Sequence, residues 1–255
     1  MIFPIGDWPN PPGHRPWLTW LLISINFAVW IFFGLPLSET RPDLASPLVG
    51  EYLTSISPAL GSQAQVAALT HQLTDWDLFV FRWGFRPDAP ALRTLLSSMF
   101  LHAGLAHLAG NMLFLWIYGN NIEHRLGRPG FLAAYLGGGV VATLFHWFSA
   151  SSSPVPMVGA SGAISGILGF YFVLFPRNQV RMLWLLPPFF LQQFLVPARL
   201  VLGLYLVIEN VLPWLFTSSD VGVAHGAHIG GFVAGWFVAR FCLRGDHDLL
   251  VHDGM

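Results

Sequence analysis

The feature that most constrains this chain is a stretch of 48 consecutive residues without a formally charged side chain, Pro129 to Pro176. A segment rich in serine and proline, 149–156, divides it, and the second part is marginal for a membrane-spanning helix, which needs about 20 residues. If a helix begins at Ser161, about 15 residues follow, or roughly 22 Å. Such a helix begins below the membrane surface, where irregular backbone occurs only if protein buries it or water reaches it. The sequence therefore predicts a water-filled cavity within the bilayer, with Ser161 on its floor.

The composition supports a membrane protein. Hydrophobic residues make up 54% of the chain and charged residues only 10%, with a mean hydropathy of +0.58, whereas soluble domains have about 25% charged residues. A net charge of −1 gives no case for a nucleic-acid partner. Cys242 is the single cysteine, so an internal disulfide and a cysteine-based metal site are excluded. We expect one membrane domain with no cofactor and no metal.

Apolar runs predict six membrane-spanning helices and hence an all-α polytopic membrane protein. The predicted spans are 17–36, 94–118, 131–147, 161–175, 200–216 and 221–239. Residues 38–93 are too polar to span and are expected to form a large external loop. The apolar run 182–196 is interrupted by Pro187 and Pro188, so we expect an interfacial or re-entrant loop there. Residues 1–16 and 245–255 are then tails, and 17–244 form the membrane domain.

The arginine residues predict the orientation of these spans. With six spans, one side of the membrane receives most of the arginines: Arg15, Arg125, Arg128, Arg177, Arg181, Arg199, Arg240 and Arg244. The two short loops on the opposite side carry none, and the long first loop, which carries four, obeys the charge rule less strictly. The positive-inside rule therefore places both termini in the cytoplasm and opens the Ser161 cavity to the outside. We expect a multi-pass protein of a bacterial inner membrane.

Polar side chains inside membrane helices are costly and usually functional. They gather in three predicted spans, as His102, His107 and Asn111, as Ser161, and as His225 and His228. Serine is a weak nucleophile unless a base takes its proton, and histidine is the usual base. Because the fourth and sixth spans contain no aspartate, the available chemistry is a serine–histidine dyad. Glycines spaced four apart in both spans allow the two helices to pack closely.

An acyl-transfer site must also stabilise an oxyanion with fixed hydrogen-bond donors. The backbone N–H of Ser161, at the predicted start of a helix, is one candidate. The side chains of His107 and Asn111 are two more, and their spacing of four residues places them on one helix face.

Three motifs occur in chain order on three different spans. They are His102-x4-His107-x3-Asn111, Gly159-Ala160-Ser161-Gly162 and Ala227-His228-x-Gly230-Gly231. This combination resembles the rhomboid family of intramembrane serine proteases over about Met99 to Arg240. The segment Glu123-His124-Arg125-Leu126-Gly127 is similar to the loop that follows the second span in that family.

The resemblance implies a rhomboid-like bundle that cleaves transmembrane segments of single-span proteins in the lipid bilayer. It implies Ser161 as nucleophile, His228 rather than His225 as base, and His107, Asn111 and the Ser161 N–H at the oxyanion. His102, Gly159 and Gly162 are implied as supporting residues. The chain departs from the family pattern at Leu92-Arg93-Thr94, where many members have Trp-Arg. It departs again at Ser165, where some members have a tyrosine against the catalytic histidine, so the sequence assigns no residue to orient the His228 ring.

Two other classes of function stay open. A metal-dependent membrane enzyme would use the four histidines of the second and sixth spans, but such sites usually add carboxylates. Glu209 is the only carboxylate inside a predicted span, and we expect it to be structural or gating. A non-enzymatic membrane binding protein is the second alternative. Inactive relatives of proteases typically lack the serine or the histidine, and both are present here.

Overall fold

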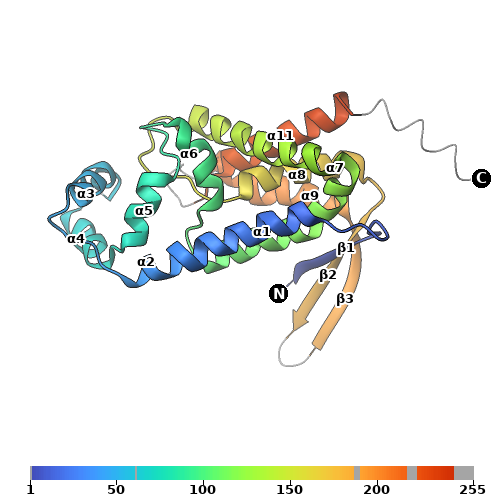
Figure 1. Cartoon of the computed structure of the whole chain (residues 1–255), viewed down its shortest axis with the longest axis horizontal. Coiled ribbons are helices and arrows are strands. Elements are labelled where there is room, and N and C mark those ends of the chain that lie inside the picture. The colour runs from blue at the N-terminus through green and yellow to red at the C-terminus, as the bar shows by residue number, and fades with distance from the viewer. Residues whose placement is uncertain (1, 61, 187–189, 217–222, 244–255) are drawn as a thin grey trace, which may run out of the picture.

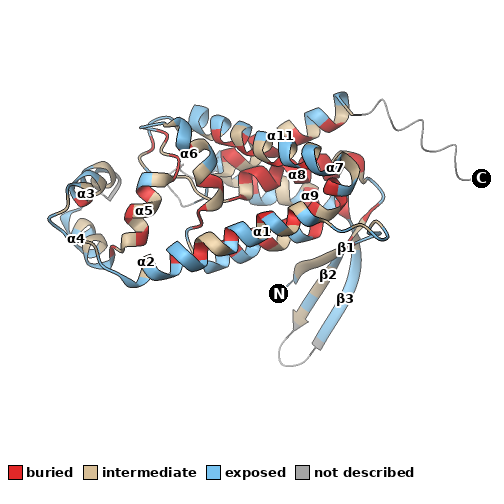
Figure 2. Cartoon of the chain, viewed as in Figure 1, coloured by how far each residue is buried: buried red, intermediate tan, exposed pale blue. Residues whose placement is uncertain are grey.

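The computed structural model describes residues 2–60, 62–186, 190–216 and 223–243. In Figure 1 these residues form a helical bundle, with a small sheet at one end and a group of short helices at the other. The bundle is organised around α8 (Ser161–Leu174), which begins at Ser161 as predicted. Every residue of α8 from Gly162 to Tyr171 is buried, and Figure 2 shows the buried residues gathered on α8 and on the sides of its neighbours that face it.

The outer surface of the bundle is apolar. Among the residues that the structure describes, three helical segments are long and apolar enough to cross a membrane: Trp17–Glu39, Leu105–Ser149 and Ala198–Phe216. Large side chains such as Phe32, Trp116 and Phe148 are exposed on these segments. Exposed apolar surface of this extent marks contact with another apolar phase, and a helix satisfies its own backbone hydrogen bonds in lipid. The chain is therefore an integral membrane protein with a helical membrane fold.

The helix α7 (Leu105–Ser149) supplies two of the walls around α8. Its helical geometry is interrupted at Gly127, whose φ of 67° is strained for a residue with a side chain. The chain reverses there, so the two arms lie on different sides of the bundle (Figure 1). The second span was predicted to begin at residue 94, but the long helix α7 begins only at Leu105. The residues before it form the short helices α6 (Leu92–Ser97) and η2 (Ser98–Phe100) and a loop.

The N-terminal segment of the bundle packs beside the first arm of α7. It consists of α1 (Trp17–Val29), a π-helical turn η1 (Trp30–Gly34) and α2 (Leu35–Glu39). The buried carboxylate of Glu123 accepts hydrogen bonds from the backbone N–H groups of Leu18 and Thr19 and from the Thr19 hydroxyl. Because the first N–H groups of a helix lack partners within the helix, this carboxylate caps α1. In the segment Glu123 to Gly127, the acidic residue therefore has a structural role, which is to join α7 to the start of α1.

The remaining walls come from the C-terminal part of the chain. They are α9 (Ala198–Leu206), the π-helical turn η3 (Val207–Val211), α10 (Leu212–Phe216) and α11 (His225–Phe241). The helix α11 packs tightly on α8, because an added Cβ at Gly231 or Gly235 would collide with the carbonyl oxygen of Gly162 or Gly166. By contrast, most side chains of α9, η3 and α10 are exposed or half-buried.

The polar segment between the first two predicted spans folds into short helices. These are α3 (Pro47–Leu60), α4 (Gln63–Gln72) and α5 (Asp75–Trp83). Beyond α5 the chain pairs with the loop that precedes α8, because Phe85 and Met157 exchange two backbone hydrogen bonds and the Asp88 N–H donates to the Ser153 carbonyl. This segment therefore holds the loop that leads into Ser161.

The fold is mostly helical, as expected, but it is not all-α, because the structure contains a three-stranded antiparallel sheet. Its strands are β1 (Ile2–Trp8), β2 (Gln179–Leu186) and β3 (Phe190–Pro197), in the order β1-β2-β3. The run 182–196 is thus a hairpin and not a span, as expected, although Pro187 and Pro188 lie outside the described residues. Residues 2–8 are not a free tail but strand β1, which the proline-rich neighbourhood concealed.

The sheet is joined to the bundle through a buried polar network. Asp7 of β1 accepts hydrogen bonds from the Tyr171 hydroxyl and from Asn121 Nδ2, and Asn178 Nδ2 donates to the same hydroxyl. Burial raises the pKa of Asp7 to about 6, because loss of water outweighs the hydrogen bonds that favour the charged form. We therefore expect the attachment of β1 to α7 and α8 to depend on pH.

Candidate active site

Ser161 and His228 are in direct contact, although 67 residues separate them. Ser161 is the first residue of α8, and His228 lies in the first turn of α11. The distance from Ser161 Oγ to His228 Nε2 is 2.7 Å, which is the distance of a good hydrogen bond. The glycine contact between Gly162 and Gly231 brings the two helices close enough for this bond to form.

His107 and Asn111 converge on the loop just before Ser161. A Cβ built on Gly159 would lie 2.8 Å from His107 Cε1, 2.9 Å from His107 Nε2 and 3.5 Å from Asn111 Nδ2. Gly159 also has a φ of 123°, a backbone conformation that only glycine adopts without strain. Asn111 is buried, and its Nδ2 has no hydrogen-bond partner among the described residues. A buried donor without a partner is costly, and this one lies beside the loop that leads into Ser161.

His102 holds the backbone that carries the serine. It is 1% exposed, and its Nε2 accepts a hydrogen bond from the Ala160 N–H at 3.4 Å. The Gly159 N–H donates to the Ser98 carbonyl at 2.9 Å. His102 therefore contacts the loop before α8, and its ring packs edge-on against that of His107 at 5.2 Å between centroids.

The structure places two residues at the site that the sequence analysis missed. Asn210 of η3 is 1% exposed, and its Oδ1 lies 2.6 Å from His228 Nδ1. The Tyr205 ring of α9 lies 6.5 Å from the His228 ring, and its hydroxyl contacts Ser165 Oγ at 3.0 Å. A tyrosine from another helix thus stands near the histidine although position 165 is serine. Asn210 could have been recognised from the sequence as a candidate site residue, because a polar amide in an apolar membrane helix is usually functional.

The other polar groups near the site do not touch Ser161. The His225 ring lies 6.5 Å from that of His228, and its Nδ1 is buried without a partner in the described part of the chain. Glu209 is exposed on η3. Throughout the described residues, no group of three or more histidine, cysteine, aspartate or glutamate side chains is arranged to hold a metal ion.

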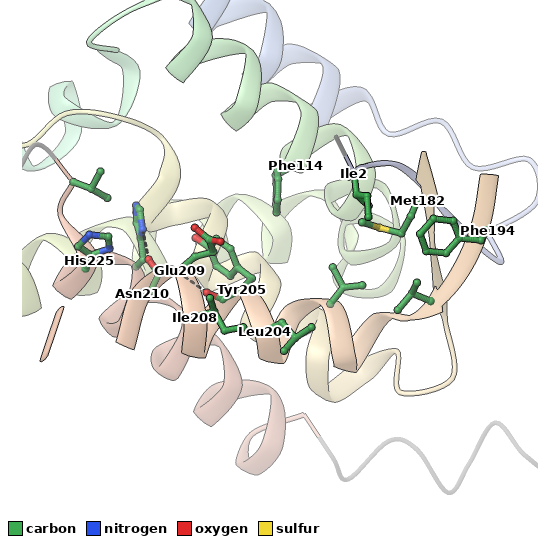
Figure 3. Close-up of a pocket in the computed structure, with 14 residues that line it drawn as sticks. Ile2, Phe114, Met182, Phe194, Leu204, Tyr205, Ile208, Glu209, Asn210 and His225 are labelled. Carbon is green, nitrogen blue, oxygen red and sulfur yellow. Dashed lines mark hydrogen bonds between the residues drawn. The ribbon is translucent and has the colours of Figure 1, made fainter. Parts of the chain in front are cut away.

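A groove of about 770 Å³ leads from His228 along the outside of η3 and α9 to the sheet. Figure 3 shows Phe114 of α7 on one side of it, Tyr205, Ile208 and Glu209 on the other, and Ile2 with Met182 and Phe194 at the far end. Its walls are mainly apolar, so the groove suits an apolar segment that approaches His228 from the side of the bundle.

Comparison with known protein families agrees with this geometry. The family model described as the Rhomboid domain matches residues 89–245. The chain belongs to the rhomboid family. All the residues of the site, from Ser98 to His228, lie inside the matched region.

Individual rhomboid relatives match a similar part of the chain. The mitochondrial RHOMBOID-like protein 12 of Arabidopsis thaliana is 31% identical over 55% of this chain and 43% of its own length. The rhomboid protease GluP of Bacillus subtilis is 32% identical over 57% of this chain and 25% of its own length. The human mitochondrial presenilin-associated rhomboid-like protein is 31% identical over 58% of this chain and 39% of its own length.

The chain therefore covers less than half the length of these relatives. Two of the three are mitochondrial and one is bacterial. The expectation of a bacterial inner membrane is not supported, because mitochondrial and bacterial relatives match about equally well. What stands is an integral membrane protein of the rhomboid family.

Proposed function

We propose that this chain is an intramembrane serine endopeptidase that works through Ser161 and His228. The observation that carries the proposal is the 2.7 Å contact between Ser161 Oγ and His228 Nε2 at the start of a buried helix. In the first step Ser161 Oγ attacks the carbonyl carbon of a peptide bond while His228 Nε2 accepts the hydroxyl proton. His228 then gives this proton to the leaving amine, and water, activated by the same histidine, hydrolyses the acyl-enzyme.

The oxyanion formed in both steps needs fixed donors. The Ser161 N–H, His107 and Asn111 are the proposed donors, and the unpaired Nδ2 of Asn111 supports this assignment. Gly159 keeps the pocket open because a side chain there would collide with His107. Gly162 supports the site by allowing the second arm of α7 to approach α8, because a Cβ there would lie 2.7 Å from Ala142 Cβ. His102 supports the site through the Ala160 N–H.

The proposed substrate is the transmembrane segment of a single-span protein, reached sideways from lipid past α9. A helix hides its peptide bonds in its own hydrogen bonds, so it must unwind locally before the serine can attack. Glycine or proline in the substrate lowers that cost. The apolar groove that runs from His228 along α9 supports this route.

We further propose six spans, with both ends of the membrane domain 17–244 on the arginine-rich, cytoplasmic side and the Ser161 cavity open to the other. The chain reversal at Gly127 supports two spans within α7. Reporter fusions at Arg125 and Arg177 are expected to read inside, and a fusion at Asp75 outside. The opposite reading at Asp75 would contradict this topology.

The experiment that tests the function is co-expression with a panel of single-span membrane proteins. Cleavage products are expected for at least one member of the panel, and they should disappear with Ser161→Ala and with His228→Ala. Products that persist in the Ser161→Ala variant would refute the assignment of the nucleophile. Replacing the helix breakers of a cleaved substrate with leucine should slow its cleavage in liposomes.

A further inference from the structure

The fold places an asparagine, Asn210, behind the proposed catalytic base. Asn210 lies in η3, a π-helical turn between α9 and α10. A π-helical turn widens the helix by one residue and is frequent at functional sites. Here the Asn210 side chain reaches back five residues, and its Nδ2 donates to the Tyr205 carbonyl at 2.9 Å. The local distortion therefore creates an acceptor that fixes the orientation of this amide.

The fixed amide determines which histidine nitrogen carries the proton. A backbone carbonyl can only accept, so the atom of Asn210 that faces Tyr205 must be Nδ2. Oδ1 then faces His228 Nδ1 at 2.6 Å, and because Oδ1 can only accept, Nδ1 must carry the proton. In the neutral ring Nε2 is consequently unprotonated and can accept the Ser161 hydroxyl proton, 2.7 Å away.

We propose that Asn210 is a positioning residue for catalysis, which completes a Ser161–His228–Asn210 chain of hydrogen bonds from the helix that borders the groove. The inference rests on the proposed protease function and deepens it. The arrangement has the geometry of a triad in which the third group sets the tautomer and orientation of the imidazole. Asn210 contacts neither Ser161 nor the scissile bond and acts only through His228.

A closed ring of contacts connects Ser161, His228 and Asn210 across three helices. Ser161 and Ser165 lie one turn apart on α8, and Ser165 Oγ contacts the Tyr205 hydroxyl of α9. The Tyr205 carbonyl then holds Asn210, which holds His228 of α11, which returns to Ser161. The position of α9 against the bundle therefore sets the orientation of the base.

The test compares three variants, each purified in detergent and assayed on one cleaved substrate. Asn210→Leu keeps the approximate volume but removes the acceptor, and Asn210→Asp keeps an acceptor for His228 Nδ1–H. Asn26→Leu is the matched control, because Asn26 of α1 is also fully buried and donates Nδ2 to a backbone carbonyl, that of Leu22. A general cost of replacing a buried amide would affect Asn26→Leu as well.

We expect Asn210→Leu to lower kcat on the order of 10- to 100-fold, with KM within about twofold, as for a lost hydrogen bond to a group that becomes charged in the transition state. Asn210→Asp, which keeps the acceptor but loses the donor to the Tyr205 carbonyl, should recover part of the loss. Asn26→Leu should keep the wild-type kcat. Wild-type kcat in Asn210→Leu, an effect on KM alone, or an equal loss of kcat in Asn26→Leu would each overturn the inference.

A second measurement is independent of proteolysis. The ¹⁵N resonances of His228 should report a single tautomer, protonated at Nδ1, in the wild type and a mixture in Asn210→Leu. The same tautomer in both proteins would overturn the inference. If no substrate were cleaved by the wild type but the tautomer shifted as expected, the proposed function would fail while the contact itself stood.

Discussion

Replacement of Gly231 by alanine is the sharpest structural test of how the site is assembled. Gly231 lies three residues after His228 on α11, and it faces the carbonyl oxygen of Gly162, the residue after Ser161. An added Cβ would lie well inside the van der Waals radius of that oxygen. Because the clash is with backbone, no rotamer change relieves it.

The expected size of the effect follows from the contact. The helices α8 and α11 must separate by roughly 1 Å before the new methyl group reaches ordinary contact distance. The bond from Ser161 Oγ to His228 Nε2, now 2.7 Å, would then exceed hydrogen-bond range. A displacement of that size costs about 10²-fold in rate, and overpacking of this kind destabilises by about 1–3 kcal/mol.

The assay measures kcat and resistance to thermal unfolding for Gly231→Ala beside Gly137→Ala. Gly137 is an exposed glycine of α7 with no heavy atom within 4 Å of a built Cβ, so it serves as the matched control. We expect wild-type kcat in the control and a stability change within about 1 kcal/mol. A folded Gly231→Ala protein with wild-type kcat would refute the claim that close packing of α8 and α11 positions the dyad.

The remaining predictions concern the oxyanion, the base and the sheet. Asn111→Ala should lower kcat by about 10²–10³-fold, less if the other donors compensate, and a large rise in KM with unchanged kcat would instead give Asn111 a binding role. His228→Ala should abolish proteolysis while His225→Ala retains substantial activity, and equal loss in two folded variants would contradict the choice of base. The pKa of Asp7 is raised from 3.8 to about 6 in the folded protein. Between these two pH values the Asp7 carboxyl keeps its proton in the folded protein but loses it in the unfolded chain. Wild-type stability should therefore fall as pH rises from about 4 to 6, by at most about 3 kcal/mol, and in thermal unfolding this dependence should vanish in Asp7→Asn.

Much of the site was predictable because its signals are local. Small residues around Ser161 and at Gly231 predicted a close helix pair, and the structure places those glycines in backbone contact. The start of α8 at Ser161 also followed from the loop before it and the length of the apolar run after it. Both inferences depended on residues that are near one another in the chain or that obey helical spacing.

What could not be predicted depends on contacts between distant segments or on local distortion of a helix. Asn210 reaches His228 only because η3 departs from the regular helix, and regular periodicity does not reveal a π-helical turn. Glu209 drew attention as the charged neighbour, yet it is exposed while Asn210 is buried. The strand Ile2–Trp8 escaped notice because its partner, β2, is about 175 residues away and pairing at that distance leaves no local pattern.

The most direct test of the central claim is mass-spectrometric mapping of a serine-directed fluorophosphonate on the purified protein. Such a reagent forms a covalent bond only with a serine whose proton a neighbouring base removes. The account predicts one adduct, on Ser161, which is lost in Ser161→Ala and strongly reduced in His228→Ala. No adduct on the folded wild-type protein, or labelling of Ser161 that is unchanged in His228→Ala, would contradict it.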